Sequence, residues 1–347
     1  MKPVRFAHSP PEAGHLDAPH RVAYLGDLVL ESGAVIHDFH QSYVIHGDLD
    51  QGRSEVVLVC ASLAGNHHRL DFLIGPGKAL DPERFCVVAT DPIGNGLSTS
   101  PSSSVRQHGM RFPDFCLRDM VHAQYRLMTE HLRVEAMHAV VGASMGGMQA
   151  LQWAVSHPRF LRNCVAMTPM ARTAPWAALV TEAARACLTA DPAWDGSAFQ
   201  GVPERGWRAW TGLMSALLSR TPAALEDLAL EPEGVRNWLD GLVARNRTLG
   251  FDATDYLYQS RAYAAHDVGS TPGLAGTAAA LARVEARVLV MAPPLDLFNP
   301  AGDARKAAVG IPGAVFVEIP SSGGHQSASG TRSTDAAFLN QIIARFL

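Results

Sequence analysis

Short, mostly apolar segments alternate with amphipathic segments along most of the chain. Such segments recur at Val56–Cys60, Phe85–Ala89, Ala136–Val141, Asn163–Met167, Arg287–Met291 and Val315–Ile319. A run of this length without polar alternation is typical of a strand buried on both faces of a parallel sheet. Helical periodicity lies between several of them, as at Leu117–Leu132. The alternation predicts an α/β fold with a doubly wound, mostly parallel sheet.

Two parts of the chain depart from this alternation. The first forty residues are polar and rich in Pro and His, so we expect an irregular lead-in followed by edge strands at Val35–His40 and Ser42–Gly47. Residues 171–275 contain no apolar strand, but are rich in Ala, Leu and Trp with helical periodicity. We therefore predict a helical cap at 171–275, inserted into a core formed by 1–170 and 276–347. The tryptophans of this stretch are expected mainly to pack within the cap, with pocket lining as the alternative: Trp176, Trp194, Trp207 and Trp210.

Composition narrows the class of partner. The 347 residues are 47% hydrophobic and 18% charged, with a formal net charge of −4 and no Lys/Arg run. Neither nucleic acid nor a membrane surface is therefore an expected partner. The N-terminus lacks the apolar stretch of a signal peptide and no segment is long enough to span a bilayer, so a cytoplasmic location is expected. Five widely spaced cysteines, an odd number, favour buried free thiols over disulfides.

The segment Gly142-Ala143-Ser144-Met145-Gly146 carries the first chemical signal. It follows a predicted buried strand and leads directly into a helical stretch, Gly147–Val155. A serine held in a tight strand-to-helix turn needs residues without bulk two positions away on either side, which explains both glycines. This turn is the nucleophile elbow of α/β-hydrolase folds, and it makes Ser144 the candidate nucleophile.

A serine nucleophile needs a histidine base and an acid that orients the base, and in this fold they follow in the order Ser, acid, His. Asp296 lies just past the strand Arg287–Met291, and His325 follows the last strand in a Gly-rich loop. Asp303 is the rival acid, but it falls in the first turn of a predicted helix, where Asp is common. The sequence thus predicts a Ser144–Asp296–His325 triad.

An acyl-transfer site also needs two N–H groups that hold the oxyanion. By position these are the backbone N–H groups of Met145, after the nucleophile, and Leu63, in the loop after the first buried strand. No cofactor or metal is expected. The pairs His67-His68 and His37/His40 lack further ligands at a workable spacing, so we interpret them as solvated or core histidines.

Beyond the elbow, longer stretches resemble the homoserine O-acetyltransferase family, and the match runs from about residue 35 to the C-terminus. The stretches concerned are Gly142–Trp153, Ile74–Asp81, Arg118–Val121, Phe251–Tyr258 and Leu281–Val284. The resemblance implies the hydrolase core, a helical cap, the same triad, an acyl-serine intermediate and homodimers paired through their caps.

The chain departs from that family at positions that meet the acceptor. Family acetyltransferases usually carry an Asp directly after the catalytic His, where this chain has Gln326. They also carry an Arg and a Tyr seven residues apart on a cap helix, and the ungapped match places Thr211 and Leu218 there; Arg208 or Arg220 could substitute in a shifted register. A zwitterionic amino acid needs charged partners in a buried site, so homoserine is expected to bind poorly. Some family members resemble esterases of small acetate esters, and this site is similar to theirs.

Three functions remain open. The first is a serine carboxylic-ester hydrolase for short acyl groups, with acetates of small alcohols as substrates. The second is an O-acyltransferase that uses acetyl-CoA or succinyl-CoA with an acceptor other than homoserine. The triad cannot separate the two reactions, because both share the acyl-serine and differ only in whether water or an alcohol resolves it. The third is a non-catalytic binding protein on the same scaffold, which an intact triad disfavours.

Overall fold

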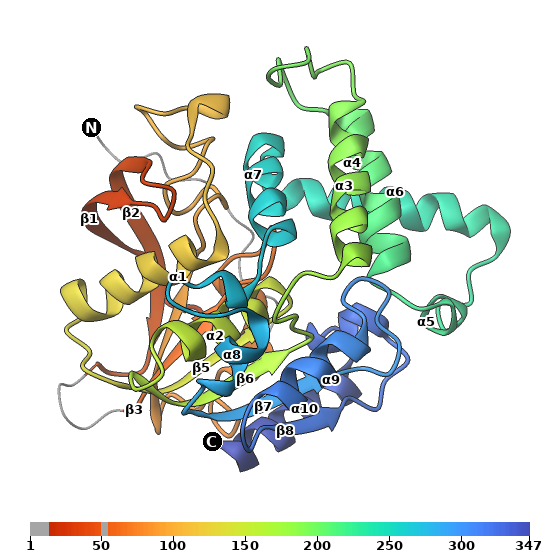
Figure 1. The fold of residues 1–347 in the computed structure, drawn as a ribbon. Helices are drawn as coiled ribbons and strands as arrows, with labels where there is room; N and C mark the ends of the chain where they lie inside the picture. The colour runs from red at the N-terminus through yellow and green to blue at the C-terminus, as the bar shows by residue number, and fades with distance from the viewer. Residues whose placement is uncertain (1–13, 50–54) are drawn as a thin grey trace.

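The protein is described by a computed structural model over residues 14–49 and 55–347. This part of the chain builds an eight-stranded sheet flanked by helices (Figure 1). The order of the strands across the sheet is β1-β2-β4-β3-β5-β6-β7-β8. Their bounds are β1 Arg21–Val29, β2 Val35–His46, β3 Glu55–Cys60, β4 Phe85–Thr90, β5 Met137–Ala143, β6 Leu161–Met167, β7 Arg287–Ala292 and β8 Val315–Glu318.

From β4 to β8 all strand pairs are parallel, whereas β2 joins β4 antiparallel. The six apolar runs all form strands, and alternate residues of one strand serve opposite faces. Leu58 and Cys60 belong to the core on one face, and Val57 and Val59 to the core on the other. Burial on both faces explains why five of these runs lack polar alternation, whereas β8 is an edge strand whose residues are exposed or half-buried. The predicted doubly wound, mostly parallel sheet is confirmed.

The N-terminal prediction was wrong in two respects. Residues 21–29, expected to be irregular, form β1, which pairs antiparallel with β2. Only part of β1 is buried, around Ala23 and Leu28, and register shifts on either side of Gly26 interrupt its alternation, so the strand has no clean period in the sequence. The two expected edge strands are one continuous strand, β2. The strand can bury the polar Ser42 near its middle because the Ser42 hydroxyl donates a hydrogen bond to the Asp91 carboxylate at 2.7 Å.

Helices cover both faces of the sheet. The apolar sides of α1, α2, α8 and α9 join the core on one face, and those of η1 and α10 join the core on the other. The helices outside residues 168–286 are η1 His67–Leu73, η2 Gly109–Arg111, α1 Leu117–Arg126, the π-helical η3 Leu127–His131, α2 Met145–Ser156, α9 Ala301–Gly310, η6 Gly324–Ala328 and α10 Ser333–Phe346.

Between β6 and β7, where the structure describes every residue, the chain forms helices and no strand of the sheet. In Figure 1, α3, α4 and α6 stand away from the sheet, while α7 returns toward it. The elements are α3 Pro175–Thr189, α4 Glu204–Trp210, the π-helical η4 Thr211–Leu218, α5 Pro222–Glu226, α6 Pro232–Thr248, α7 Ala253–Ala264, η5 Val268–Ser270 and α8 Thr277–Ala282. The helical character matches the expectation, and the division into core and cap at 170 and 276 stays a prediction.

Aromatic side chains hold these helices together. The rings of Trp207 and Trp210 are buried and lie 5.4 Å apart, and Trp210 packs edge-on against Tyr256 of α7 at 5.3 Å. Trp194 packs in the same manner against Phe199 at 4.8 Å. Within the described residues, no helix is both long and apolar enough to cross a membrane.

Candidate active site

Ser144 sits in the turn between β5 and α2, with a φ of 57°. This left-handed backbone is costly for a residue with a side chain, and it persists where the surroundings enforce it. The surroundings are tight: a methyl group on Gly142 would overlap with the carbonyl oxygen of Gly146, and one on Gly146 would overlap with that of Cys60. Both glycines are therefore required by the close approach of the helix to the strands, as the elbow pattern predicts.

The structure brings the three predicted triad residues together. His325 Nε2 lies 2.9 Å from Ser144 Oγ, and His325 Nδ1 lies 2.7 Å from Asp296 Oδ2. All three residues are at most 7% exposed. Because Asp296 accepts at Nδ1, the imidazole presents Nε2 to the serine hydroxyl in the tautomer that a general base requires.

Asp296 is held in place by the backbone of its own loop. Its Oδ1 accepts hydrogen bonds from the N–H groups of Phe298 at 2.9 Å and Asn299 at 2.8 Å, which leaves Oδ2 for the imidazole. The Phe298 ring packs edge-on against His325 at 5.1 Å. Fixed on two sides, the imidazole cannot easily turn away from the serine.

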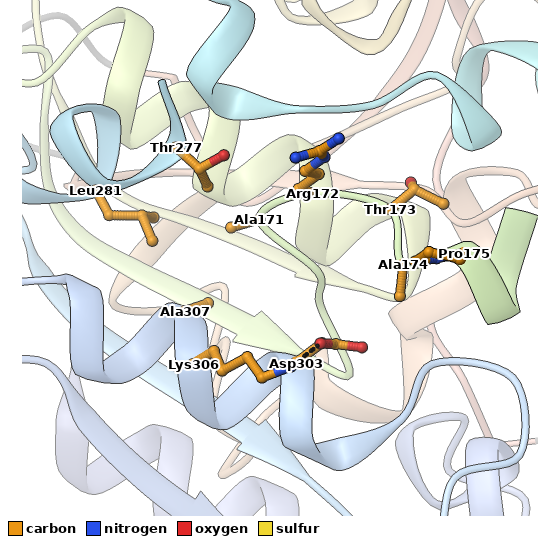
Figure 2. Close-up of a pocket in the computed structure, with 10 residues that line it drawn as sticks. All are labelled: Ala171, Arg172, Thr173, Ala174, Pro175, Thr277, Leu281, Asp303, Lys306 and Ala307. Carbon is orange, nitrogen blue, oxygen red and sulfur yellow. Dashed lines mark hydrogen bonds and ion pairs between the residues drawn. The ribbon is translucent and has the colours of Figure 1, made fainter. Parts of the chain in front are cut away.

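Asp303, the rival acid, lies elsewhere. It occupies the first turn of α9, and its carboxylate pairs with Lys306 one turn later at 3.0 Å. Both residues line an open surface pocket of about 460 Å³ between α8, α9 and the segment that follows β6 (Figure 2). None of the triad residues lines this pocket, and its walls are formed by Ala171, Arg172, Thr173, Ala174, Pro175, Thr277, Leu281, Asp303, Lys306 and Ala307.

The two expected oxyanion donors lie on segments that pack closely at the elbow. Met145 is the first residue of α2, where backbone N–H groups have no partner within the helix and the helix dipole favours negative charge. Leu63 lies in a tight turn closed by a hydrogen bond from Gly65 N to the Ser62 carbonyl, at 2.9 Å. Gln259 of α7 fixes this turn by accepting from the next residue, Ala64 N, at 2.9 Å.

Tyr263 of α7 is a site residue that the sequence analysis missed. Its hydroxyl donates to Asn299 Oδ1, and its ring stacks on Phe298 at 5.4 Å. Burial, followed by the negative charge of Asp296, raises the pKa of Tyr263 well above its ordinary value, although hydrogen bonds to Asn299 and Ser144 act in the opposite direction. The phenol therefore stays protonated beside the nucleophile. A tyrosine in a helix has no local sequence pattern that marks it as part of a site.

The two positions matched to acceptor-binding residues carry no charge. Thr211 is buried at the start of η4, and its hydroxyl oxygen accepts from Asn246 at 3.0 Å. Leu218 ends the same helix. Gln326, directly after His325, accepts from the Ser329 hydroxyl at 2.9 Å through its side-chain oxygen. The amide of Gln326 is thus engaged within its own turn.

Both candidate arginines, Arg208 and Arg220, already have partners for their guanidinium groups. Arg208 forms an ion pair with Asp240 of α6. Arg220 donates to the backbone carbonyl of Ser215 and lies over the Trp238 ring, 5.5 Å from its centroid. Each guanidinium is therefore engaged by other residues of the helical segment between β6 and β7.

Trp176, at the start of α3, contacts the loop that carries Asp296. Its indole N–H donates to the carbonyl of Leu297, the residue after Asp296, at 2.8 Å, and the residue is 54% exposed.

Comparison with known proteins agrees with this fold. The family model described as the α/β-hydrolase fold matches residues 55–325. An ethyl acetate hydrolase from Pseudomonas veronii is 30% identical, covering 94% of each chain. A homoserine O-acetyltransferase from Thermobifida fusca is 32% identical, covering 92% of each chain. Among solved structures, the acetyl esterase MekB superposes with a TM-score of 0.87 at 28% identity, covering 94% of this chain and 96% of that one.

The fold, the strand-to-helix elbow and the extent of these matches lead to one conclusion. The chain belongs to the α/β-hydrolase family of enzymes, among relatives that include homoserine O-acetyltransferases and an ethyl acetate hydrolase.

Proposed function

We propose that the protein is a serine carboxylic-ester hydrolase that cleaves short-chain esters, above all acetates of small alcohols, through an acyl-serine intermediate. The observation that carries the proposal is the hydrogen-bonded chain from Ser144 through His325 to Asp296, buried at the elbow. This arrangement activates a hydroxyl for attack on an acyl carbon. The name of the ethyl acetate hydrolase relative supports the acetate ester as substrate class.

Acylation begins when Ser144 Oγ attacks the ester carbonyl carbon and its proton passes to His325 Nε2. The carbonyl oxygen becomes an oxyanion, which the N–H groups of Met145 and Leu63 stabilise. The bond between the acyl carbon and the alcohol oxygen then breaks. The leaving alkoxide takes the proton from Nε2 and departs as the alcohol.

Deacylation repeats the sequence with water. His325 Nε2 takes a proton from a water molecule, whose oxygen attacks the acyl carbon. The bond to Ser144 Oγ breaks, and Oγ recovers the proton from Nε2 as the carboxylic acid leaves. Asp296 orients the imidazole throughout and stabilises its charged form.

The choice of water over an amino-acid acceptor rests on the residues around the triad. A zwitterion such as homoserine requires charged partners once it leaves water. Gln326 and Thr211 are uncharged and already hydrogen-bonded, and Arg208 and Arg220 are engaged within the cap. These contacts support hydrolysis.

A CoA-dependent O-acyltransferase is the second candidate, with acetyl-CoA as donor. It is favoured by relatives named as homoserine acyltransferases at 32% and 33% identity over most of the chain. The triad chemistry is common to both reactions, so only the fate of the acyl-serine separates them.

A paired assay on one purified sample tests the proposal. Acid release from ethyl acetate and thiol release from acetyl-CoA with homoserine are measured in parallel, with Ser144→Ala as the control for both. We expect ester turnover that Ser144→Ala abolishes, and no homoserine-dependent thiol release. Thiol release that requires homoserine and exceeds ester hydrolysis would establish the acyltransferase instead.

A further inference from the structure

Arg69, the third residue of η1, is a partly buried cation beside the turn that precedes this helix. Within the described residues, its guanidinium forms no ion pair with an acid. Burial lowers its pKa to about 10, so the group stays charged at neutral pH. Removing a cation from water without a counter-charge is costly, and groups perturbed in this way gather at functional sites.

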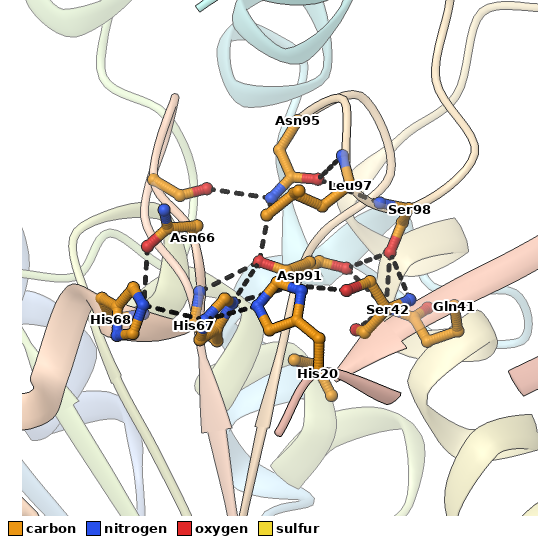
Figure 3. A network of polar contacts seen from close by, with 12 residues as sticks. His20, Gln41, Ser42, Asn66, His67, His68, Asp91, Asn95, Leu97 and Ser98 are labelled. Carbon is orange, nitrogen blue, oxygen red and sulfur yellow. Dashed lines mark hydrogen bonds and ion pairs between the residues drawn. The ribbon is translucent and has the colours of Figure 1, made fainter. Parts of the chain in front are cut away.

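The two buried acids around η1 are engaged by histidines instead. Asp71 Oδ2 lies 2.7 Å from His68 Nδ1, and both carboxylate oxygens of Asp91 lie 3.1 Å from His67 Nδ1 (Figure 3). Asp91 also accepts from the His67 backbone N–H at 3.0 Å. The charge of Arg69 is therefore not used to neutralise either acid.

The guanidinium contacts the turn that carries Leu63. Its Nε–H donates to Ser62 Oγ at 3.0 Å, and the Ser62 hydroxyl donates to the Ala143 carbonyl at 2.8 Å. Because an arginine only donates, the Ser62 proton lies on the carbonyl, and each of the two bonds strengthens the other. These bonds connect Arg69 to the residue before Leu63 and to the residue before Ser144.

The other residues of this turn are fixed as well. Ala64 N donates to Gln259 Oε1 at 2.9 Å, and the Gly65 carbonyl accepts from Asn95 at 3.2 Å. The Leu63 N–H itself makes no hydrogen bond to the part of the chain that the structure describes. A rigid turn with one unused N–H is what an oxyanion hole requires.

We propose that Arg69 is a positioning residue of the oxyanion hole, which fixes the Leu63 N–H through Ser62 and places a positive charge next to the turn that binds the developing oxyanion. The inference rests on the proposed acyl-serine chemistry at Ser144. It adds a residue that acts on the transition state without touching the substrate.

The charge of the reacting oxygen gives this cation its effect. The ester carbonyl oxygen carries only a partial charge, whereas the tetrahedral intermediate carries a full negative charge. Ser62 is 6% exposed and Ser144 is 3% exposed, so little water screens the interaction. Arg69 therefore stabilises the intermediate more than the bound ester, which raises kcat and leaves KM nearly unchanged.

The test uses the full-length protein and compares Arg69→Met, Arg69→Lys and Ser62→Ala with the control Arg106→Met. Arg106 is exposed and pairs with Asp38, so its replacement should leave kcat at the wild-type value. The measurements are kcat and KM with p-nitrophenyl acetate, and the dissociation constant of trifluoroacetone by calorimetry. The adduct of this ketone with a serine hydroxyl is a tetrahedral oxyanion.

We expect Arg69→Met to lower kcat at least about tenfold while KM changes by less than about threefold, and to weaken trifluoroacetone binding by the same factor as kcat. Arg69→Lys keeps the charge without the planar fork, so it should retain more activity than Arg69→Met. Ser62→Ala breaks the same link and should lower kcat at least about fivefold.

Circular dichroism of each variant controls for folding, and Ser62→Ala decides the question if Arg69→Met does not fold. A folded Arg69→Met enzyme with kcat within about twofold of the wild type would overturn the inference, and so would a lower kcat with unchanged affinity for trifluoroacetone. An unchanged kcat in Ser62→Ala would overturn it as well. The proposed function fails separately, if the wild type has no ester turnover that depends on Ser144, and the affinity for trifluoroacetone tests Arg69 in either case.

Discussion

Replacement of the acid by its amide, Asp296→Asn, separates the role of Asp296 in orienting the base from its role in folding. The amide oxygen can still accept from the backbone N–H groups of Phe298 and Asn299, so the loop should keep its shape. The amide nitrogen then faces His325 Nδ1 at the position of the 2.7 Å contact. Two donors cannot share that contact, and the imidazole must move its proton to Nε2.

A proton on Nε2 removes the acceptor that Ser144 needs, because Nε2 lies 2.9 Å from Ser144 Oγ. In triad enzymes, loss of the correct tautomer lowers kcat by about 10⁴, equivalent to about 5 kcal/mol of transition-state stabilisation. The carboxylate of Asp296 is fully buried, so solvent cannot replace its charge. We therefore expect a loss of this size with p-nitrophenyl acetate.

The assay compares kcat for the wild type, Asp296→Asn and the matched control Asp303→Asn. The control should keep wild-type activity, because Asp303 pairs with Lys306 on α9. Melting curves establish that both variants fold. A folded Asp296→Asn enzyme with more than a tenth of wild-type kcat, or an Asp303→Asn enzyme that loses activity, would refute the assignment of the acid.

Three further predictions concern stability. Burial lowers the pKa of His266 to about 3, so between about pH 6.5 and 3 the unfolded chain binds a proton that the native chain does not, and stability falls as pH falls. In urea titrations at pH 7.5 and 5, His266→Gln should reduce this loss of stability by about 2 kcal/mol. An unchanged loss in the variant would contradict the prediction. Gly146→Ala should cost at least about 3 kcal/mol because its methyl group meets a β3 carbonyl, whereas Gly302→Ala, with open space, should be neutral or stabilising in denaturant melts. Tyr263→Phe should cost about 1–3 kcal/mol by leaving Asn299 Oδ1 without its donor, and should slow ester turnover; an unaltered Tm and kcat would remove Tyr263 from the account.

The meeting of Ser144, His325 and Asp296 could be predicted because candidate catalytic residues of this fold follow the ends of strands. Ser144, Asp296 and His325 each follow a strand whose continuous apolar run is visible in the sequence. Parallel strands bring their carboxyl ends to one edge of the sheet, so residues far apart in the chain meet there. The elbow glycines added a local steric signature.

The sequence did not predict the partly buried strand β1 or the contacts between residues far apart in the chain. The strand β1 is buried only in part and carries a register shift around Gly26, so it lacks a clean period. Tyr263 reaches the site from a helix, and His20 reaches His67 across 47 residues. Such contacts depend on how elements pack, and no pattern within one element encodes them.

The pairing of two chains through their caps and the cytoplasmic location also stay predictions. Sedimentation of the purified protein across a range of concentrations would test the first. A dimer that dissociates on mutation of the exposed Leu179 of α3 would support pairing through the cap, and a monomer at all concentrations would exclude it.

The most direct test of the central claim is to trap and locate the acyl group. The enzyme is mixed with p-nitrophenyl acetate, quenched within the first turnover and digested for peptide mass mapping. We predict a burst of p-nitrophenol of about one equivalent per chain, acetyl on Ser144, and loss of that adduct to water as free acetate. Acetyl on another residue, or a Ser144→Ala enzyme that retains turnover, would contradict the account.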